Sequence, residues 1–251
     1  MNAVWLILTP ALCVVAAAQA GPKQSFEVSK TERVPFTSAG RIRIQGSYGY
    51  LAVEGWDEPD VEISVIKSTD KFYDPGQREK EEQRFDKVRV VTEHSSETEL
   101  TISTTPAVRT KVSILPWLPS PRHGMTPDYR IRVPRNSKLD VRNDSGYVWV
   151  SDIAGDIDVR SHTGDMIVLL PEPGSYSIDA KTGLGSVSSD FVGNGHRYMA
   201  GTHFVREGTA PARQIYLRMG RGSIEVKNGA TAPSVIEPPM AQPNGGSGLR
   251  D

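Results

Sequence analysis

A short motif recurs along this chain, in which a glycine is followed by apolar residues two and four positions later. The clear copies are Gly40–Ile44, Gly49–Val53, Gly146–Val150, Gly155–Val159 and Gly164–Val168, and weaker copies are Gly185–Ser189 and Gly222–Val226. Gly40 and Gly49 are nine residues apart, and the same interval separates Gly146, Gly155 and Gly164. Of the fourteen positions two and four after the seven glycines, only Ser189 is not apolar. This alternation is typical of strands with one buried face.

The repeat predicts an all-β fold in which each unit is about five residues of strand followed by a turn. A β-solenoid or β-roll of nine-residue units, with about two units per turn, is favoured because every strand restarts in the same phase. A β-sandwich also has short strands at roughly 8–12-residue spacing, and it remains the alternative.

The N-terminus indicates export. Residues 1–20 carry no charged side chain, and an apolar stretch from Val4 to Ala18 runs into the small-x-small pattern Ala18-Gln19-Ala20. The apolar stretch is shorter than the roughly 20 residues that a membrane span needs. We therefore expect a signal peptide at 1–20 and a mature chain in the periplasm, on the cell surface or outside the cell. The only cysteine, Cys13, lies in this leader, so the mature chain has no disulfide.

Further patterns divide the mature chain, which we expect to be one domain over residues 21–227 with no transmembrane segment. The sequence Asp74-Pro75-Gly76-Gln77 resembles a helix start, and the charged run after it predicts a short surface helix over about 74–87. A strand is expected at Val61–Val65, and a hairpin is expected around the polar stretch 94–97. A Pro-rich loop is expected over about 105–127 and a disordered tail over 228–251.

Several of these stretches together resemble a known family. They are Gly49–Asp57 with its Gly-Trp-Asp ending, Ile131–Pro134, Leu139–Asn143 and Ser145–Val150. The chain is similar over about residues 34–226 to the bacterial putative-adhesin family, an exported family whose domain is of unknown function. The resemblance implies a right-handed β-helix-like fold, a cell-envelope location and an adhesin-like or scaffold role. It brings no catalytic residues with it.

Composition and motifs favour binding without catalysis. Lysine and arginine number 29 against 30 acidic residues, which argues against a nucleic-acid partner. The histidines form no metal-binding motif, no cofactor motif occurs, and Ile157 stands where a calcium-binding nonapeptide would need aspartate. Asp156, Asp158 and Asp165 could line one face of a coil together with Arg160, as in a polysaccharide-active β-helix enzyme. Outward carboxylates are equally expected for solubility, so the enzyme is kept as the alternative.

Three aromatic residues are the candidate binding residues. Tyr50, Tyr147 and Trp149 occupy outward positions, and the units next to Tyr147 and Trp149 carry aspartate or serine at the equivalent places. They either pack under the inserted helix or the Pro-rich loop, or they form an exposed stripe. An exposed stripe would suit a cell-envelope glycan or a protein partner.

Overall fold

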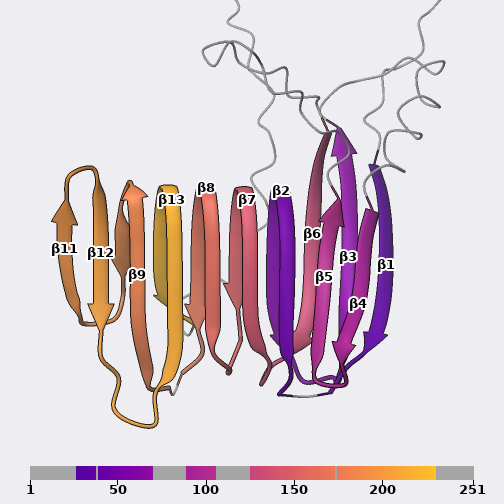
Figure 1. Ribbon diagram of the computed structural model, residues 1–251, viewed down its shortest axis with the longest axis horizontal. Helices are drawn as coiled ribbons and strands as arrows, with labels where there is room; N and C mark the ends of the chain where they lie inside the picture. Colours follow the sequence, from indigo (N-terminus) through magenta and orange to yellow (C-terminus); the bar gives the residue numbers. More distant parts are fainter. Residues whose placement is uncertain (1–26, 38, 70–88, 106–124, 173, 230–251) are drawn as a thin grey trace, which may run out of the picture.

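The computed structural model describes residues 27–37, 39–69, 89–105, 125–172 and 174–229. These residues are all-β, and their strands form one large mixed sheet that does not close on itself (Figure 1). The expected leader, the helix over 74–87 and nearly all of the expected tail lie outside the described residues. Within the described ranges, no helix is long and apolar enough to span a membrane.

The strands are β1 Glu27–Pro35, β2 Arg41–Trp56, β3 Asp60–Thr69, β4 Arg89–Ser96, β5 Glu99–Thr105, β6 Met125–Pro134, β7 Lys138–Ser151, β8 Ile157–Leu170, β9 Tyr176–Leu184, β10 Val187–Ser189, β11 Asn194–Tyr198, β12 Gly201–Arg206 and β13 Arg213–Asn228. The expected strand at Val61–Val65 lies in β3, and the expected hairpin is the antiparallel pair β4–β5. Most of the Pro-rich loop expected over about 105–127 also lies outside the described residues, and its last three residues belong to β6, which begins at Met125 and pairs with β3.

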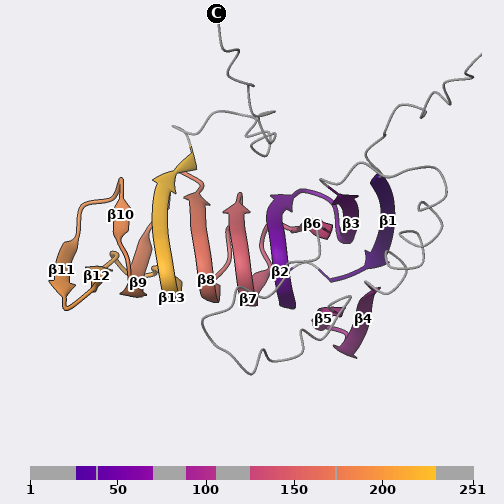
Figure 2. The same ribbon diagram turned by 90° about the horizontal axis from the view of Figure 1, so that it is seen from above.

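Four strands, β2, β7, β8 and β13, are about three times as long as the repeat predicts. Each bends at a glycine with positive φ, and these glycines are Gly49, Gly146, Gly164 and Gly222. The bend lets the chain change direction without interrupting the strand, so two segments that the sequence suggests are separate become one. We call the residues before the glycine the first leg and those after it the second leg. Seen from above, β7, β8 and β13 pass over the molecule as arches whose legs lie on opposite sides (Figure 2).

Neighbouring arches pair in parallel with equivalent residues in register. Between β7 and β8, Leu139 lies beside Ile157 and Gly146 beside Gly164, a shift of 18 residues or two repeat units. The same register joins β2 to β7, where Gly49 lies beside Gly146, and β8 to β13, where Gly164 lies beside Gly222. Like residues therefore occupy the same row on successive strands.

Both legs point their alternate apolar residues into a single core. On β2, Ile42 and Ile44 of the first leg and Val53 of the second leg are fully buried. The equivalent residues of β7, β8 and β13 belong to the same cluster, and these are Leu139, Val141, Val148, Val150, Ile157, Val159, Met166, Val168, Ile215, Leu217, Ile224 and Val226. The predicted inward and outward positions of the repeat are therefore confirmed.

The order of strands in space differs from their order in sequence. From one end the order is β1-β3-β6-β2-β7-β8-β13-β9-β12-β11. The last long strand, β13, lies between β8 and β9, parallel to both. The chain therefore forms β9–β12 first and then returns to place β13 between β8 and β9. Strands that are neighbours in space are for this reason not always neighbours in sequence.

The glycine bends generate a stability prediction. A Cβ on Gly164 would lie far inside van der Waals contact of the Gly146 carbonyl, and its φ of 127° is strained for any other residue. Gly164→Ala should therefore lower the free energy of unfolding by about 3 kcal/mol or more, since strain and steric overlap add. Gly195→Ala is the matched control, because no atom lies within 4 Å of the Cβ position there. Urea unfolding measures both variants, and equal midpoints would contradict the role of the bend.

Candidate ligand-binding surface

The predicted aromatic residues lie on the second legs, on the outward side. Tyr50, Tyr147, Asp165 and Ser223 form one row across β2, β7, β8 and β13. The side chains that follow them in sequence, Leu51, Val148, Met166 and Ile224, are buried in the core. Strand alternation therefore turns the row away from the core, as the sequence predicts.

Tyr50 and Tyr147 stack on each other. Their ring centroids are 5.4 Å apart and their planes differ by 10°. The in-register pairing of β2 and β7 places the two rings on adjacent strands, where such stacking is favourable. Both rings are half-buried, so part of each remains accessible. The sequence identifies both residues but gives no sign of the stack, because 97 positions separate them.

Burial raises the pKa of both phenols, so their hydroxyl groups stay protonated to a higher pH than an exposed tyrosine. Burial raises the pKa of Tyr147 to about 12, with smaller contributions from Tyr50, Glu225 and Asp165. The pKa of Tyr50 is also raised, chiefly by burial, with Arg130 lowering it and Asp128 raising it further. At neutral pH both hydroxyl groups can donate hydrogen bonds to a ligand.

The next outward row extends the apolar surface. Ala52, Trp149 and Ile167 lie side by side on β2, β7 and β8, and all three are half-buried. Together with Tyr50 and Tyr147 they form what we call the aromatic patch. Its polar margin on β8 and β13 is Asp165, Ser223 and Glu225. Flat rings next to carboxylates and hydroxyls suit a sugar ring or an apolar protein side chain.

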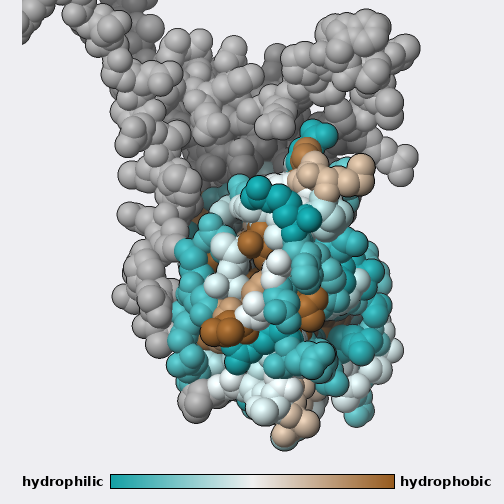
Figure 3. Space-filling view, turned by 90° about the vertical axis from the view of Figure 1, so that its left-hand side faces the viewer, coloured by the Kyte–Doolittle hydropathy of each residue, from teal (hydrophilic) through white to brown (hydrophobic). Residues whose placement is uncertain are grey.

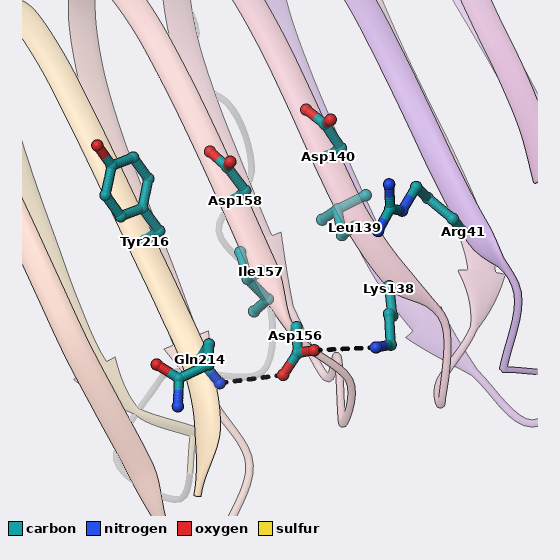
Figure 4. A pocket seen from close by; sticks show the side chains of 9 residues that line it. All are labelled: Arg41, Lys138, Leu139, Asp140, Asp156, Ile157, Asp158, Gln214 and Tyr216. Atoms are coloured by element: carbon teal, nitrogen blue, oxygen red, sulfur yellow. Dashed lines mark hydrogen bonds and ion pairs between the residues drawn. The ribbon is translucent and has the colours of Figure 1, made fainter. Parts of the chain in front are cut away.

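A shallow depression of about 280 Å³ lies on the first legs (Figure 4). Three carboxylates, Asp140, Asp156 and Asp158, line it with Tyr216 and the cations Arg41 and Lys138. Asp156 accepts a hydrogen bond of 3.0 Å from the backbone N–H of Gln214 and pairs with Lys138 at 3.3 Å. The structure thus brings together two of the predicted acids, Asp156 and Asp158.

Asp165 lies apart from the other two predicted acids. The bend at Gly164 carries it to the second leg, where it accepts hydrogen bonds from the hydroxyl of Ser223 at 2.6 Å and its backbone N–H at 3.1 Å. Asp158 is held between Arg142 and Arg160, each at 3.1 Å. The expectation that all three line one face with Arg160 is therefore wrong for Asp165.

Two histidines that the sequence leaves isolated are brought together. His196 and His203 lie directly opposite each other in the β11–β12 pair, and His203 Nε2 lies 2.7 Å from Asp179 Oδ1. Within the described residues, no group of three or more His, Cys, Asp or Glu side chains is arranged to hold a metal ion.

Exposed apolar residues also occur at the β11 end of the sheet, where Figure 3 shows them scattered among polar ones. Val192 and Met199 are almost fully exposed, and Leu184 is 43% exposed. Single exposed apolar residues are ordinary on a protein surface. Val192, which is 90% exposed, is therefore suitable as a control position.

Comparison with known proteins shows a likeness in fold but none in sequence. No family model matches the chain, and no curated protein matches it in sequence. Among solved structures it is similar to a "putative cell adhesion protein" from Clostridium sporogenes, with a TM-score of 0.50 and 16% identity, over 81% of this chain and 100% of that one. It is also similar to a "putative adhesin" from Bacteroides fragilis, with a TM-score of 0.30 and 11% identity, over 80% of this chain and 97% of that one. A third match is a "putative lipid binding protein" from Parabacteroides distasonis, with a TM-score of 0.21 and 11% identity, over 80% of this chain and 94% of that one.

At 16% identity the Clostridium sporogenes likeness shows the fold alone, and the two lower TM-scores carry no argument. The resemblance stated from the sequence is thus supported at the level of an all-β fold shared with a protein named for cell adhesion. Membership of the bacterial putative-adhesin family stays a prediction, because no family model matches.

The raised pKa of Tyr147 predicts how stability changes at high pH. A pKa that is higher in the folded state contributes stability that is complete below the unfolded value of about 10 and is lost as the pH rises through about 12. The free energy of unfolding should therefore fall more steeply over this window in the wild type than in Tyr147→Phe. The difference in phenolate absorbance between the two proteins should show a midpoint near pH 12, whereas a midpoint near 10 would mean an open ring.

Proposed function

We propose that this chain is an exported, cell-envelope adhesin-like or scaffold module that binds a glycan or a protein without catalysis. The observation that carries the proposal is the aromatic patch, in which the stacked Tyr50 and Tyr147 lie beside Trp149 on the outward side of the second legs. Aromatic side chains dominate the energetics of many binding surfaces. The likeness to a solved structure named for cell adhesion supports the same reading at the level of fold.

The proposal includes a right-handed β-solenoid or roll over residues 21–227, preceded by the leader at 1–20. Parallel ladders with an 18-residue shift between β7 and β8 support such a coil, because two nine-residue units then make one level. A solenoid also exposes a long, regular surface on each side, which suits an extended partner.

Replacing the aromatic patch tests binding directly. Tyr147→Ser with Trp149→Ser should weaken binding to a cell-wall preparation by more than about 1 kcal/mol, or roughly fivefold. Because Tyr147 also stacks on Tyr50, unfolding should become easier by about 1 kcal/mol, which leaves the protein folded at the assay temperature. Val192→Ser removes an exposed apolar residue elsewhere and should change neither quantity. Pull-down and thermal unfolding are measured together, and unchanged binding with lowered stability would mean that the aromatic residues serve only packing.

The depression on the first legs favours a second candidate, a polysaccharide-active enzyme. Its three carboxylates are of the residue type that acid–base cleavage of a glycosidic bond uses. The test is to incubate the protein with cell-wall polysaccharides and to measure newly formed reducing ends. Turnover that disappears in Asp156→Asn and in Asp158→Asn would establish the enzyme and overturn binding without catalysis. If no reducing ends form, the binding proposal stands.

A further inference from the structure

Four basic side chains form one row across the first legs of β7, β8 and β13 and the adjacent strand β9. Arg142 on β7, Arg160 on β8, Arg218 on β13 and Lys181 on β9 are paired in register from strand to strand. We call them the cation row. His203 of β12 lies beside Lys181 and continues the row at its edge.

The position of each basic residue of the cation row is fixed by the repeat. Each of the four cations stands four residues before a positive-φ glycine, namely Gly146, Gly164, Gly222 and Gly185. Two residues earlier stand Asp140, Asp158, Tyr216 and Asp179, which form a second outward row. Because both rows follow from the position of a side chain in its unit, the stacking of units generates them together.

The aspartates of this second row hold the three arginines of the cation row in place. Arg142 lies 2.7 Å from Asp140 and 3.1 Å from Asp158, and Arg160 also lies 3.1 Å from Asp158. Arg218 lies 2.7 Å from Asp179. Burial acts to raise the pKa of Asp179, but the hydrogen bonds and charges of Arg218 and His203 together outweigh burial, so the pKa is lowered. These contacts fix the guanidinium groups and reduce the entropy that a ligand would otherwise have to remove.

The carboxylates do not use the whole hydrogen-bonding capacity of the row. Three carboxylates face four cations, because β13 carries Tyr216 where the other strands carry aspartate. Arg218 lies 3.6 Å and Arg160 5.0 Å from the centre of the Tyr216 ring, and this contact adds no negative charge. Each guanidinium offers five N–H donors. Arg160 remains half exposed, and Lys181 lies over the Tyr198 ring with no carboxylate partner among the described residues.

The two sides of the arches differ in charge. The first legs of β2, β7, β8 and β13, together with β9 and Asp156, carry outward seven cations and five carboxylates. The second legs of the same four strands carry outward three carboxylates and one cation. The first-leg side is therefore the one that attracts anions, although the chain as a whole has a net charge of −1.

We propose that the cation row binds a linear polyanion that runs across the strands. Neighbouring strands lie about 4.8 Å apart, so the four cations present one positive charge per strand over about 14 Å. A chain of negatively charged groups at a similar spacing, such as an acidic polysaccharide, can meet every cation at once. This site is separate from the aromatic patch, which lies on the opposite legs, and does not depend on the function proposed for that patch.

The test is binding of the full chain to polygalacturonate, heparin and polyphosphate, which carry carboxylate, sulfate and phosphate groups respectively, with neutral dextran as the comparison. Arg160→Gln with Lys181→Gln removes two exposed cations of the row and leaves the Arg218–Asp179 pair intact. Affinity for the best polyanion should fall at least about tenfold, and binding of the wild type should weaken with added salt, which screens exposed charges.

Lys30→Gln with Lys227→Gln removes the same charge from exposed positions outside the row and should lower affinity less than about twofold. Equal losses in the two double variants would overturn the proposal, because net charge alone would explain them. Absence of saturable binding to all three polyanions above the dextran level would overturn it as well. Tyr147→Ser with Trp149→Ser should bind the polyanion like the wild type, so failure at one site is distinguishable from failure at the other.

Discussion

The close contact between glycines at the bends is the constraint on which the rest of the structure depends. Gly49, Gly146, Gly164, Gly222 and Gly185 form one column, and a Cβ on any of the last four would overlap the carbonyl of the glycine on the neighbouring strand. All five have positive φ, a conformation that only glycine adopts without strain. The column brings the backbones close enough for the ladder to continue through the bend, so both legs stay in register.

In-register stacking has a cost on the outward faces, because it places like positions beside one another. A row of four cations at strand spacing would repel itself if nothing lay between its members. The aspartates that stand two residues before these cations in sequence offset the repulsion, and Asp158 is shared by Arg142 and Arg160. On the second legs the in-register pairing is favourable, since it places Tyr50 and Tyr147 side by side in a stack.

The inward and outward positions of the arches could be predicted from the sequence, because the alternation after each glycine fixes which side chains are buried. The long bent strands could not, since nothing in the repeat distinguishes Gly155, which ends a connection, from Gly164, which bends a strand. The position of β13 could not be predicted either, because pairing between residues 58 positions apart depends on packing rather than on local pattern. Local alternation is enough to identify Tyr147 and Trp149 as outward residues. The basic residues of the cation row also stand at a fixed offset from the glycines, but only the strand register shows that they lie side by side on one surface.

The return of β13 between β8 and β9 contributes to the difference in charge between the two sides of the arches. By sequence alone β9 would follow β8, which would extend the aspartate row without a break from Asp158 to Asp179. The inserted strand places Tyr216 between them, so the middle of the row has an aromatic ring in place of a third neighbouring carboxylate. Arg160 and Arg218 pack over that ring while each keeps one carboxylate partner. Within these two rows, four cations therefore face three carboxylates, and the unmatched position lies on β13, where the strand order departs from the order of the sequence.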